Sequence, residues 1–496
     1  MSADFAAAGA AARPPPLSER LKWLQALQDM LNQNWDEAVQ CIVSDLNRPV
    51  PEADTEIAVL AREIADLKAD LSSWAKPQPL STHLMFLPAF SQVRRSPYGA
   101  VLIIGPFNYP LMLTLAPLAG ALAAGNVACV KLSDQSPATS SFIARYAPMY
   151  LPSNVAMFVE GGVPETTRLL DLRWDFIVFT GSTRVAGIVQ QAAAKFMTPC
   201  LLECGGKCPA IVDETVDNIR ETAKRIASTK LVNAGQSCVT PDYVLVHKSK
   251  HADLVAALCE EMHRILGPEA ADSANLGRLC QPHMVERAAA LLDESGGSLY
   301  QIGTASFDSA SRFVPPIIVD SPSENSKLLS EELFNPILPV VPFTCLEEAI
   351  ERSRRIDPTP LAFYFFGSTP RAESVALQTK SGAFVVNDCF VHNLNHSLPF
   401  GGVATSGQGV YNGKWSFETF TYPRAFLWRY GSLCIDQLLP FPVRYPVKDM
   451  TARSHWRRKH LLRVLFLYAP YIRIPLPSFA TIILCFFTFW VARATA

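Results

Sequence analysis

The sequence lacks an excess of charge of either sign: 44 lysines and arginines balance 45 aspartates and glutamates, and the net charge is −1. Without a positive field there is no electrostatic reason to expect nucleic acid as a partner. The stretch 1–16 is rich in alanine and proline and lacks an apolar core with basic flanks, so we identify no secretory signal peptide. The twelve cysteines are scattered, which predicts free thiols in a reducing compartment.

Two common site patterns are also missing. No Gly-x-Gly-x-x-Gly follows a predicted strand, and the glycines of 407–413 follow no strand, so we reject them as a phosphate loop. Cys200, Cys204 and Cys208 are evenly spaced but have no second pair of cysteines to complete a zinc site, so we expect no metal.

What the sequence does have is length and alternation. A chain of 496 residues is too long for one core, and a hydrophobic content of 49% suits a globular enzyme. Two helices are predicted first, at 17–46 and 52–75, and then a short strand at 83–95. Strands follow at 100–104, 127–131, 155–160 and 176–180, with helices at 111–124 and from about 164 and 182. This order predicts an α/β fold with a parallel sheet covered on both faces, which binds nucleotides beyond the carboxyl ends of its strands.

One cysteine stands in a setting suited to chemistry. Cys238 lies in the turn Gly235–Pro241, which follows a predicted helix at 217–232. Backbone N–H groups in such a turn would lower the pKa of the thiol and favour a nucleophile. The alternative is an ordinary buried and inert thiol, which is the commoner case for a free cysteine.

Five segments in chain order decide between these alternatives: 105–110 (GPFNYP), 201–207 (LLECGGK), the Cys238 turn, 331–336 (EELFNP) and 399–402 (PFGG). Together they resemble the motifs of the aldehyde dehydrogenase superfamily. The block from Phe400 to Lys414 resembles the class 3 branch, which includes fatty aldehyde dehydrogenases. The resemblance covers roughly Leu17 to Arg424.

The resemblance implies an aldehyde dehydrogenase-like α/β fold and a homodimer. Its parts would be a Rossmann-type NAD-binding domain at 14–205 with an oligomerisation hairpin at about 81–97, an α/β catalytic domain at 206–414, and oligomerisation strands at 415–438.

The resemblance also implies three catalytic residues. Cys238 would add to the aldehyde carbon, because a bare aldehyde is a poor hydride donor and the tetrahedral alkoxide is a good one. Asn108, with the backbone N–H of Cys238, would hold that alkoxide. Glu203 would activate water against the thioester, and its place on a largely apolar strand predicts a raised pKa. Without the resemblance, Asn108 would be a turn residue and Glu203 a solvated strand end.

NAD is the expected cofactor, with NADP as a possibility. Gly181 and Ser182 stand where a strand turns into a helix, and the free N–H groups there suit a pyrophosphate. Lys131 and Asp134 follow a strand end and would contact the adenosine ribose, where the carboxylate would repel a 2′-phosphate. The alternative for this stretch is a structural role alone, since Ser133 or Ser136 is predicted to cap the following helix.

Glu332 and Phe334 resemble the residues that hold the nicotinamide ribose in this family. Asn335 stands where the family has glycine, and we expect it to take the positive φ of that turn. His392 and His396 are four residues apart, but their neighbours predict a loop, which we place at the substrate entrance rather than at a metal.

The C-terminal tail predicts membrane attachment. Residues 474–492 are apolar and would span about 28 Å as a helix, and the basic stretch 451–468 would form an amphipathic surface helix. The expected location is the endoplasmic reticulum, a lipid droplet or the mitochondrial outer membrane, with a cytosolic enzyme body. The alternative is a core helix folded back on the enzyme.

The function that we predict is NAD-dependent oxidation of long-chain aliphatic (fatty) aldehydes to carboxylic acids, with membrane lipid as a partner. Three alternatives remain at this stage: an apocarotenal or other isoprenoid aldehyde as substrate, a CoA-acylating aldehyde dehydrogenase, and a non-enzymatic membrane scaffold. Glu203 argues against acylation of CoA, since a hydrolytic base serves water, and the intact catalytic residues argue against a scaffold.

Overall fold

The computed structural model describes residues 14–83, 89–429 and 471–472. They fall into two compact units, one made of the chain up to Trp74 with Pro97–Thr421, the other of Ala75–Ser96 with the residues from Tyr422 onward. The predicted helices at 451–468 and 474–492 lie outside the described residues. Among the helices that are described, none is both long and apolar enough to cross a membrane.

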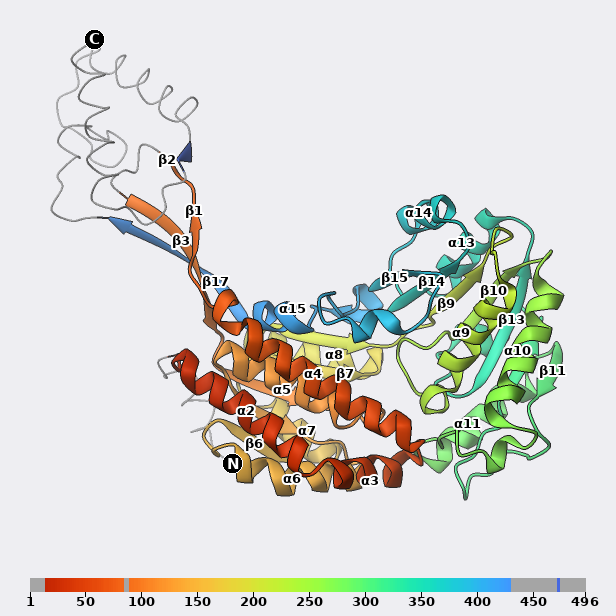
Figure 1. The fold of residues 1–496 in the computed structure, drawn as a ribbon, viewed down its shortest axis with the longest axis horizontal. Helices are drawn as coiled ribbons and strands as arrows, with labels where there is room; N and C mark the ends of the chain where they lie inside the picture. The colour runs from red at the N-terminus through yellow and green to blue at the C-terminus, as the bar shows by residue number, and fades with distance from the viewer. Residues whose placement is uncertain (1–13, 84–88, 430–470, 473–496) are drawn as a thin grey trace, which may run out of the picture. The chain divides into compact units, whose positions relative to one another are not determined.

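The first sheet of the larger unit has six strands in the order β16-β8-β7-β4-β5-β6 (Figure 1). Five run parallel and β16 runs antiparallel to β8. The bounds are β4 Ala100–Ile104, β5 Val127–Lys131, β6 Ala156–Val159, β7 Phe176–Gly181, β8 Cys200–Cys204 and β16 Gly407–Gln408. The sequence-predicted strands are therefore present, two of them with the predicted bounds.

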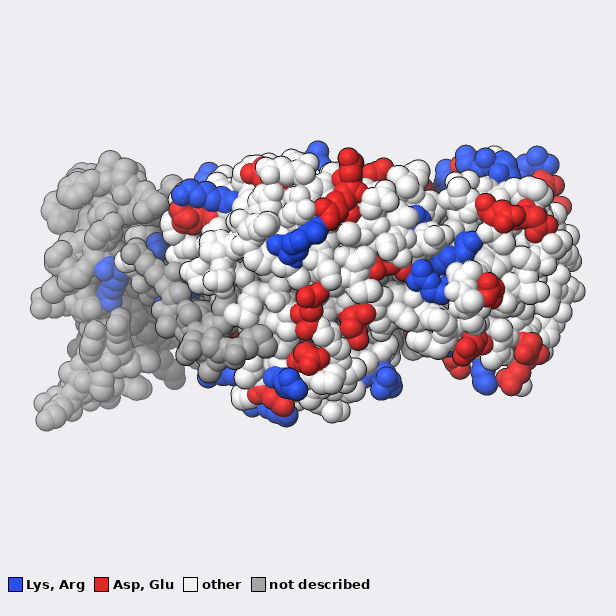
Figure 2. Space-filling view, turned by 90° about the horizontal axis from the view of Figure 1, so that it is seen from below, with Lys and Arg blue, Asp and Glu red and all other residues white. Residues whose placement is uncertain are grey.

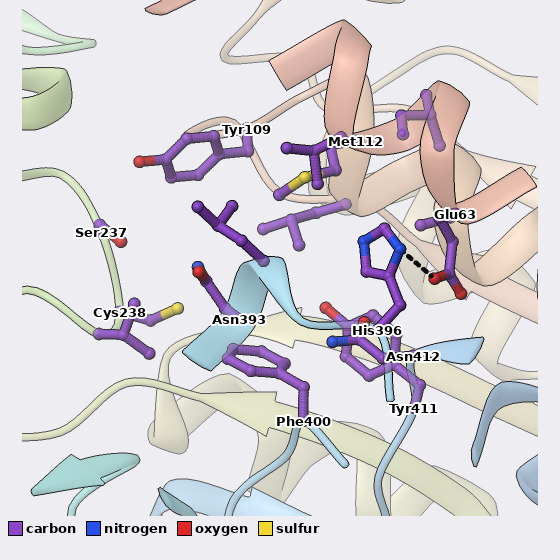
Figure 3. Close-up of a pocket in the computed structure, with 16 residues that line it drawn as sticks. Glu63, Tyr109, Met112, Ser237, Cys238, Asn393, His396, Phe400, Tyr411 and Asn412 are labelled. Carbon is purple, nitrogen blue, oxygen red and sulfur yellow. Dashed lines mark ion pairs between the residues drawn. The ribbon is translucent and has the colours of Figure 1, made fainter. Parts of the chain in front are cut away.

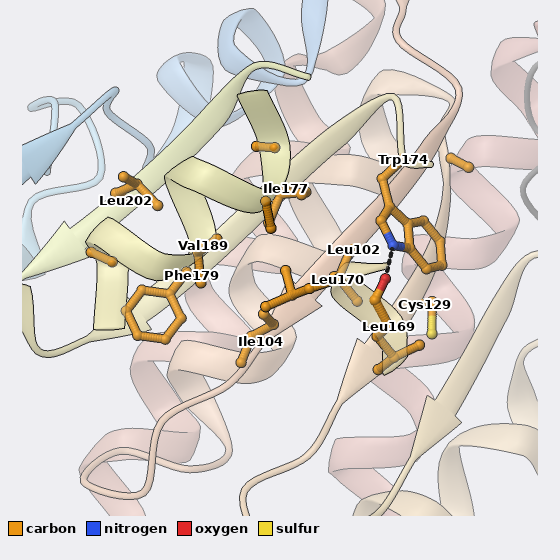
Figure 4. Packing of buried hydrophobic residues seen from close by; sticks show 14 of the residues in the cluster. Leu102, Ile104, Cys129, Leu169, Leu170, Trp174, Ile177, Phe179, Val189 and Leu202 are labelled. Carbon is orange, nitrogen blue, oxygen red and sulfur yellow. Dashed lines mark hydrogen bonds between the residues drawn. The ribbon is translucent and has the colours of Figure 1, made fainter. Parts of the chain in front are cut away.

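Helices cover both faces of this sheet, as the parallel pattern requires. On one face Leu102 and Leu202 of the sheet pack against Val189 of α8 (Figure 4). Trp174 belongs to the same core, and its Nε1–H donates to the Leu169 carbonyl at 2.7 Å, so the one polar atom of the ring is satisfied. The other face carries α5 and α6, with α2, α3 and α4 packed against them. The bounds are α2 Leu17–Gln33, α3 Trp35–Leu46, α4 Val50–Trp74, α5 Met112–Ala124, α6 Pro137–Tyr150, α7 Val163–Leu170 and α8 Thr183–Ala194.

The helix predicted over 17–46 is two helices, broken at Asn34. The Asn34 side chain donates to the Met30 carbonyl at 2.8 Å, and its backbone N–H donates to the Leu31 carbonyl. Asparagine competes in this way with the regular helix bonds, which explains an end that apolar spacing alone did not predict.

The predicted cap of α6 is also wrong. Ser136 occupies the N-cap position but makes no capping hydrogen bond, and its buried Oγ has no partner in the part of the chain that the structure describes. Asp45, at the end of α3, accepts from the N–H groups of Ala138 and Thr139 at 2.9 and 2.8 Å instead. A carboxylate from a distant helix thus satisfies the α6 N-terminus, where its charge also meets the helix dipole.

The second sheet of the larger unit has seven strands in the order β11-β12-β13-β10-β9-β14-β15, all parallel except β11. Helices α13 and α14 pack on one face, and α9 and α10 pack together beside β10 and β12. The strand bounds are β9 Pro209–Val212, β10 Tyr243–His247, β11 Ser298–Gln301, β12 Ile317–Asp320, β13 Ile337–Phe343, β14 Ala362–Phe366 and β15 Ala383–Val386. The helix bounds are α9 Ile219–Leu231, η2 Val232–Gly235, α10 His251–Leu266, η3 Ala270–Asp272, α11 Pro282–Asp293, α12 Lys327–Ser330, α13 Leu346–Ile356, α14 Thr369–Gln378, η4 Val391–Leu394, η5 Ala404–Ser406 and α15 Gly413–Thr419.

The smaller unit contains a three-stranded sheet in the order β1-β3-β17 and a two-stranded pair of β18 and β2. Its bounds are β1 Gln78–Leu80, β2 Thr82–His83, β3 Ala89–Pro97, β17 Thr421–Arg429 and β18 Tyr471–Ile472. The strand region predicted from 415 therefore begins at Thr421, because residues 413–419 form α15, and 430–438 lie outside the described residues. On the face drawn in Figure 2, acidic and basic side chains of the described residues are interspersed.

Candidate active site

Cys238 follows a turn with three consecutive left-handed residues, and one position of this turn has no room for a side chain. After α9, Asn233 and Ala234 both take left-handed φ values, 51° and 52°, and Gly235 follows with φ 77°. A Cβ on Gly235 would lie 2.2 Å from the Asn335 carbonyl oxygen, so only glycine fits there. The turn brings Cys238, which is partly exposed, to the wall of a pocket.

Glu203 lies beside this thiol, near the carboxyl end of β8. The Cys238 Sγ–H donates to Glu203 Oε1 at 3.1 Å, while Glu203 Oε2 accepts from Thr180 Oγ1 at 3.2 Å and from the Tyr411 hydroxyl at 3.4 Å. Burial raises the pKa of Glu203, and these three hydrogen bonds oppose the rise. The raised pKa expected from its strand position is thereby confirmed.

The lowered pKa expected for Cys238 is not found. Burial, followed by the negative charge of Glu203, raises the pKa of Cys238 well above its ordinary value. The N–H groups of the turn are visible in the sequence, whereas the carboxylate of Glu203 comes from β8 and approaches the thiol only in the folded chain. The arrangement holds a neutral thiol in contact with a base that can accept its proton.

Asn108 reaches the same turn from the loop between β4 and α5. Its Nδ2 donates to the Gln236 carbonyl at 3.2 Å, and its own carbonyl accepts from Asn233 Nδ2 at 2.8 Å. Asn108 is buried, at 4% exposed. An amide nitrogen carries two N–H groups, and one of those of Asn108 has no acceptor among the described residues.

The other predicted residues lie along the carboxyl ends of the same sheet. Ser182 is the N-cap of α8, and its Oγ accepts from Val185 N–H at 3.4 Å. Lys131 ends β5, donates to the Leu132 carbonyl, and has a pKa that burial lowers. Asp134 faces Gly162, where a Cβ would lie 2.9 Å from its Oδ2.

Glu332 reaches this edge from the second sheet. Its Oε1 accepts from the Gly206 N–H at 3.2 Å, and a Cβ on Gly205 would lie only 1.9 Å from that oxygen. Burial, followed by the nearby charge of Asp242, raises the pKa of Glu332 to about 7. The residues predicted for the adenosine ribose, the pyrophosphate and the nicotinamide ribose therefore lie at the carboxyl ends of the strands of the first sheet, which is the edge where parallel sheets bind nucleotides.

The turn after Glu332 corrects one expectation. Phe334, not Asn335, has the positive φ, at 54°, and its ring meets Phe107 edge to face at 6.0 Å between centroids. Asn335 instead uses its Oδ1 to accept from the Ile337 N–H at 3.0 Å. The asparagine side chain closes the turn by a local hydrogen bond, which a glycine could not do.

A pocket next to Cys238 contains residues that sequence reasoning missed (Figure 3). The apolar lining comes from α4, α5 and three later segments: Val59, Leu60, Met112, Leu113, Ala116, Val239, Leu394 and Phe400. The polar lining consists of Glu63, Tyr109, Ser237, Asn393, His396, Tyr411 and Asn412. Glu63 could have been found from the sequence, because it occupies a core-facing position of the helix predicted at 52–75, where a glutamate is unusual.

The two histidines of the predicted entrance loop behave differently. His396 lines the pocket, and its Nδ1 lies 3.1 Å from Asp66 Oδ2 and 3.3 Å from Glu63 Oε2. His392 differs: neither of its ring nitrogens has a hydrogen-bond partner among the described residues, and burial lowers its pKa to about 4. Within the described ranges no group of three or more histidine, cysteine, aspartate or glutamate side chains is placed to hold a metal ion.

Comparison with known proteins agrees with this geometry. Residues 2–426 match the aldehyde dehydrogenase family. The chain is 37% identical to 4,4'-diaponeurosporen-aldehyde dehydrogenase of Staphylococcus aureus, over 83% of this chain and 90% of that protein. It is 42% identical to aldehyde dehydrogenase family 3 member B1 of Rattus norvegicus, over 83% of this chain and 87% of that protein. The solved substrate-bound state of Staphylococcus aureus AldH superposes with a TM-score of 0.85 at 33% identity, covering 92% of this chain and 98% of that one.

The fold, the arrangement around Cys238 and these similarities lead to one conclusion. The chain belongs to the aldehyde dehydrogenase family, in its class 3 branch, and is an NAD(P)-dependent aldehyde dehydrogenase.

Proposed function

We propose that this enzyme oxidises long-chain aliphatic (fatty) aldehydes to carboxylic acids, with NAD as the preferred cofactor. The observation that carries the proposal is the pocket, which has Cys238 on its wall and eight apolar residues in its lining. Each methylene that such a lining removes from water contributes roughly 0.8 kcal/mol, so affinity should rise with chain length.

In the reaction that we propose, Cys238 is the nucleophile. Its proton passes to Glu203, 3.1 Å away, as the sulfur adds to the aldehyde carbon. The free N–H of Asn108 and the backbone N–H of Cys238 hold the resulting alkoxide. Bound NAD supplies the hydride acceptor. Glu203 releases the thiol proton to solvent and then takes a proton from the water that attacks the thioester. The carboxylic acid leaves, and the proton on Glu203 returns to the sulfur and restores the thiol.

Three pairs of residues would hold the cofactor. Gly181 and Ser182 would place α8 N–H groups against the pyrophosphate, and Lys131 and Asp134 would contact the adenosine ribose. The partly buried carboxylate of Glu332, with Phe334 beside it, would accept hydrogen bonds from the nicotinamide ribose.

The choice of NAD rests on Asp134, whose carboxylate would oppose a 2′-phosphate. We expect Asp134→Ser to raise kcat/KM with NADP relative to NAD by about tenfold, which corresponds to 1.4 kcal/mol. An unchanged ratio would show that Asp134 does not select the cofactor, and equal efficiency of the unmodified enzyme with both cofactors would refute the preference itself.

The substrate is tested with saturated aldehydes of increasing length. We expect kcat/KM to rise from short aldehydes to those of about ten carbons or more, through KM rather than kcat, because the chain binds equally in the ground and transition states. A profile that is flat or falls with length would reject the fatty aldehyde.

Isoprenoid aldehydes such as apocarotenals are the second candidate, favoured by the relative whose name is a diaponeurosporen-aldehyde dehydrogenase. Adding one to the same series decides the matter, since a kcat/KM above that of every linear aldehyde would favour this candidate. Analysis of the products with CoA present tests the acylating alternative, which Glu203 disfavours: the free acid supports hydrolysis, and acyl-CoA contradicts it.

Membrane attachment through the C-terminal tail and a homodimer that uses the β1-β3-β17 sheet are also part of the proposal. A lipid-borne aldehyde is most accessible to an enzyme held at a membrane, and the open edges of a three-stranded sheet are suited to pairing. Light scattering of the detergent-solubilised protein would contradict the dimer if it gave the mass of one chain.

A further inference from the structure

Helix α4 carries three glutamates on its inner face: Glu52, Glu56 and Glu63. Their spacings of four and seven residues place them along one side of a helix. Glu56 and Glu63 are buried, at 3% and 2% exposed, and the Glu52 side chain is 20% exposed. Carboxylates in such places are costly unless they are paired, so their partners indicate why they are there.

Glu56 holds the segment that carries Asn108. Its Oε1 accepts from the backbone N–H groups of Leu111 and Met112, at 3.0 and 2.9 Å. These two groups lie at the start of α5, three and four residues after Asn108. The carboxylate therefore determines where the Asn108 loop enters the helix.

Glu52 holds the segment that carries Cys238. Its Oε2 accepts from the Asn233 N–H at 2.9 Å, at the first of the two left-handed residues of that turn. The Asn233 side chain in turn donates to the carbonyls of Asn108 and Gln236, at 2.8 and 3.2 Å. Asn233 thus joins the two loops, and Glu52 holds Asn233.

Arg48 connects the two glutamates. It forms an ion pair with Glu56, lies 3.6 Å from Glu52, and places its guanidinium 4.6 Å from the centre of the Tyr109 ring. The Arg48 side chain is only 2% exposed. This network ties one turn of α4 to both loops of the site without contacting the pocket through any of its three charged groups.

We propose that Glu52 and Glu56, joined by Arg48, are positioning residues that hold the Asn108 amide in register with Cys238. The inference rests on the proposed roles of Asn108 and Cys238. Helix α4 would thus affect the reaction indirectly. Glu56 and Glu52 would do so through their hydrogen bonds to the backbone N–H groups of the two loops.

The test is a double-mutant cycle between Glu56→Gln and Asn108→Ala, because a residue that acts through another loses its effect when that other is absent. The probe is an activated p-nitrophenyl ester, which needs no cofactor: Cys238 displaces nitrophenolate, the thiol proton passes to Glu203, and a thioester forms. The rate of nitrophenolate release in the first turnover by the full-length enzyme measures acylation alone.

We expect Asn108→Ala to slow acylation by about 100-fold and Glu56→Gln by about tenfold. In the Asn108→Ala background, Glu56→Gln should cost less than about twofold further. A tenfold loss in both backgrounds, or no loss in either, would overturn the positioning role. A negligible effect of Asn108→Ala would instead remove the proposed function of Asn108, which separates the two failures.

Two controls keep the test interpretable. Glu37→Gln, on α3, removes an exposed carboxylate paired with Arg145 and should leave acylation unchanged. The Kd for NADH should also be unchanged in Glu56→Gln, whereas a general folding defect would weaken it. If Glu56→Gln does not fold, Glu52→Ala, which removes the oxygen that accepts from the Asn233 N–H, takes its place in the cycle. Loss of folding in both variants would assign the glutamates to stability and overturn the proposal.

Discussion

At the scale of single residues, Glu203 and Cys238 each affect the pKa of the other. Burial and then the charge of Glu203 raise the pKa of Cys238, while burial raises the pKa of Glu203 and the hydrogen bond from the thiol opposes that rise. The sulfur and the carboxylate oxygen lie 3.1 Å apart, so a change at either residue alters the pKa of the other.

Glu203→Gln should separate the two half-reactions. Glutamine cannot take a proton from water, so we expect a burst of NADH of about one equivalent per site and then turnover slowed by at least 100-fold. Removing the charge should also shift the pH profile of Cys238 alkylation by iodoacetamide to lower pH. Cys238→Ala is the control and should show neither burst nor alkylation; a uniform loss of activity with no trapped acyl-enzyme would point to another base.

The raised pKa of Glu332 predicts that the unfolding free energy of the cofactor-free enzyme depends on pH. Its pKa of about 7 in the folded protein lies above the unfolded value of about 4.3, so the folded state binds the proton more tightly. The stabilisation is complete below about pH 4.3 and is lost as the pH rises through 7. Glu332→Gln should remove this pH-dependent loss of unfolding free energy. We expect the loss to be on the order of 2 kcal/mol, because Glu332 is only partly buried and solvent screens part of the effect. Urea unfolding at pH 5.5 and 8 checks it, and equal pH slopes in both proteins would contradict it.

At the scale of elements, the shape of the nucleophile turn depends on one glycine. Gly235→Ala would place a Cβ 2.2 Å from the Asn335 carbonyl oxygen at a φ of 77°, so we expect a loss of about 2–4 kcal/mol in unfolding free energy and of most activity. The matched control is Gly187→Ala in α8, where a Cβ would meet nothing within 4 Å. There we expect a gain of up to about 1 kcal/mol. Equal effects of the two substitutions in urea unfolding would show that the turn can relax.

Element boundaries were predictable where one residue type decides them. Strands β4 and β5 are continuous apolar runs and were predicted with their observed bounds. The break at Asn34 and the cap of α6 were not, because each depends on a side-chain hydrogen bond, and in α6 the partner is Asp45, more than 90 residues away in the sequence.

At the scale of the whole molecule, the prediction concerns the tail. Truncation after Leu438 should give a soluble and active enzyme, because the proposed catalytic residues all precede it. We expect the full-length protein to resist carbonate extraction from membranes, and the truncated form to show a weaker preference for long-chain aldehydes. Full-length protein that extracts into the soluble fraction would mean that residues 474–492 do not anchor it.

Local patterns and short motifs in order predict the α/β alternation and the family, and both are confirmed. The same motifs name Cys238, Glu203 and Asn108 as the catalytic residues, and these roles stay a prediction. The pKa values, the backbone conformation and the hydrogen-bond partners of these groups follow from the tertiary structure alone. The raised pKa of Cys238 comes from burial and then from a carboxylate 35 residues away, and the positive φ belongs to Phe334 rather than to Asn335. Helix α4, which the sequence presents as a packing helix, places Glu52 and Glu56 on the backbone of the loops that carry Cys238 and Asn108. Charge, burial and hydrogen bonding act between residues that are close in space, and a linear pattern records only which residues are close along the chain.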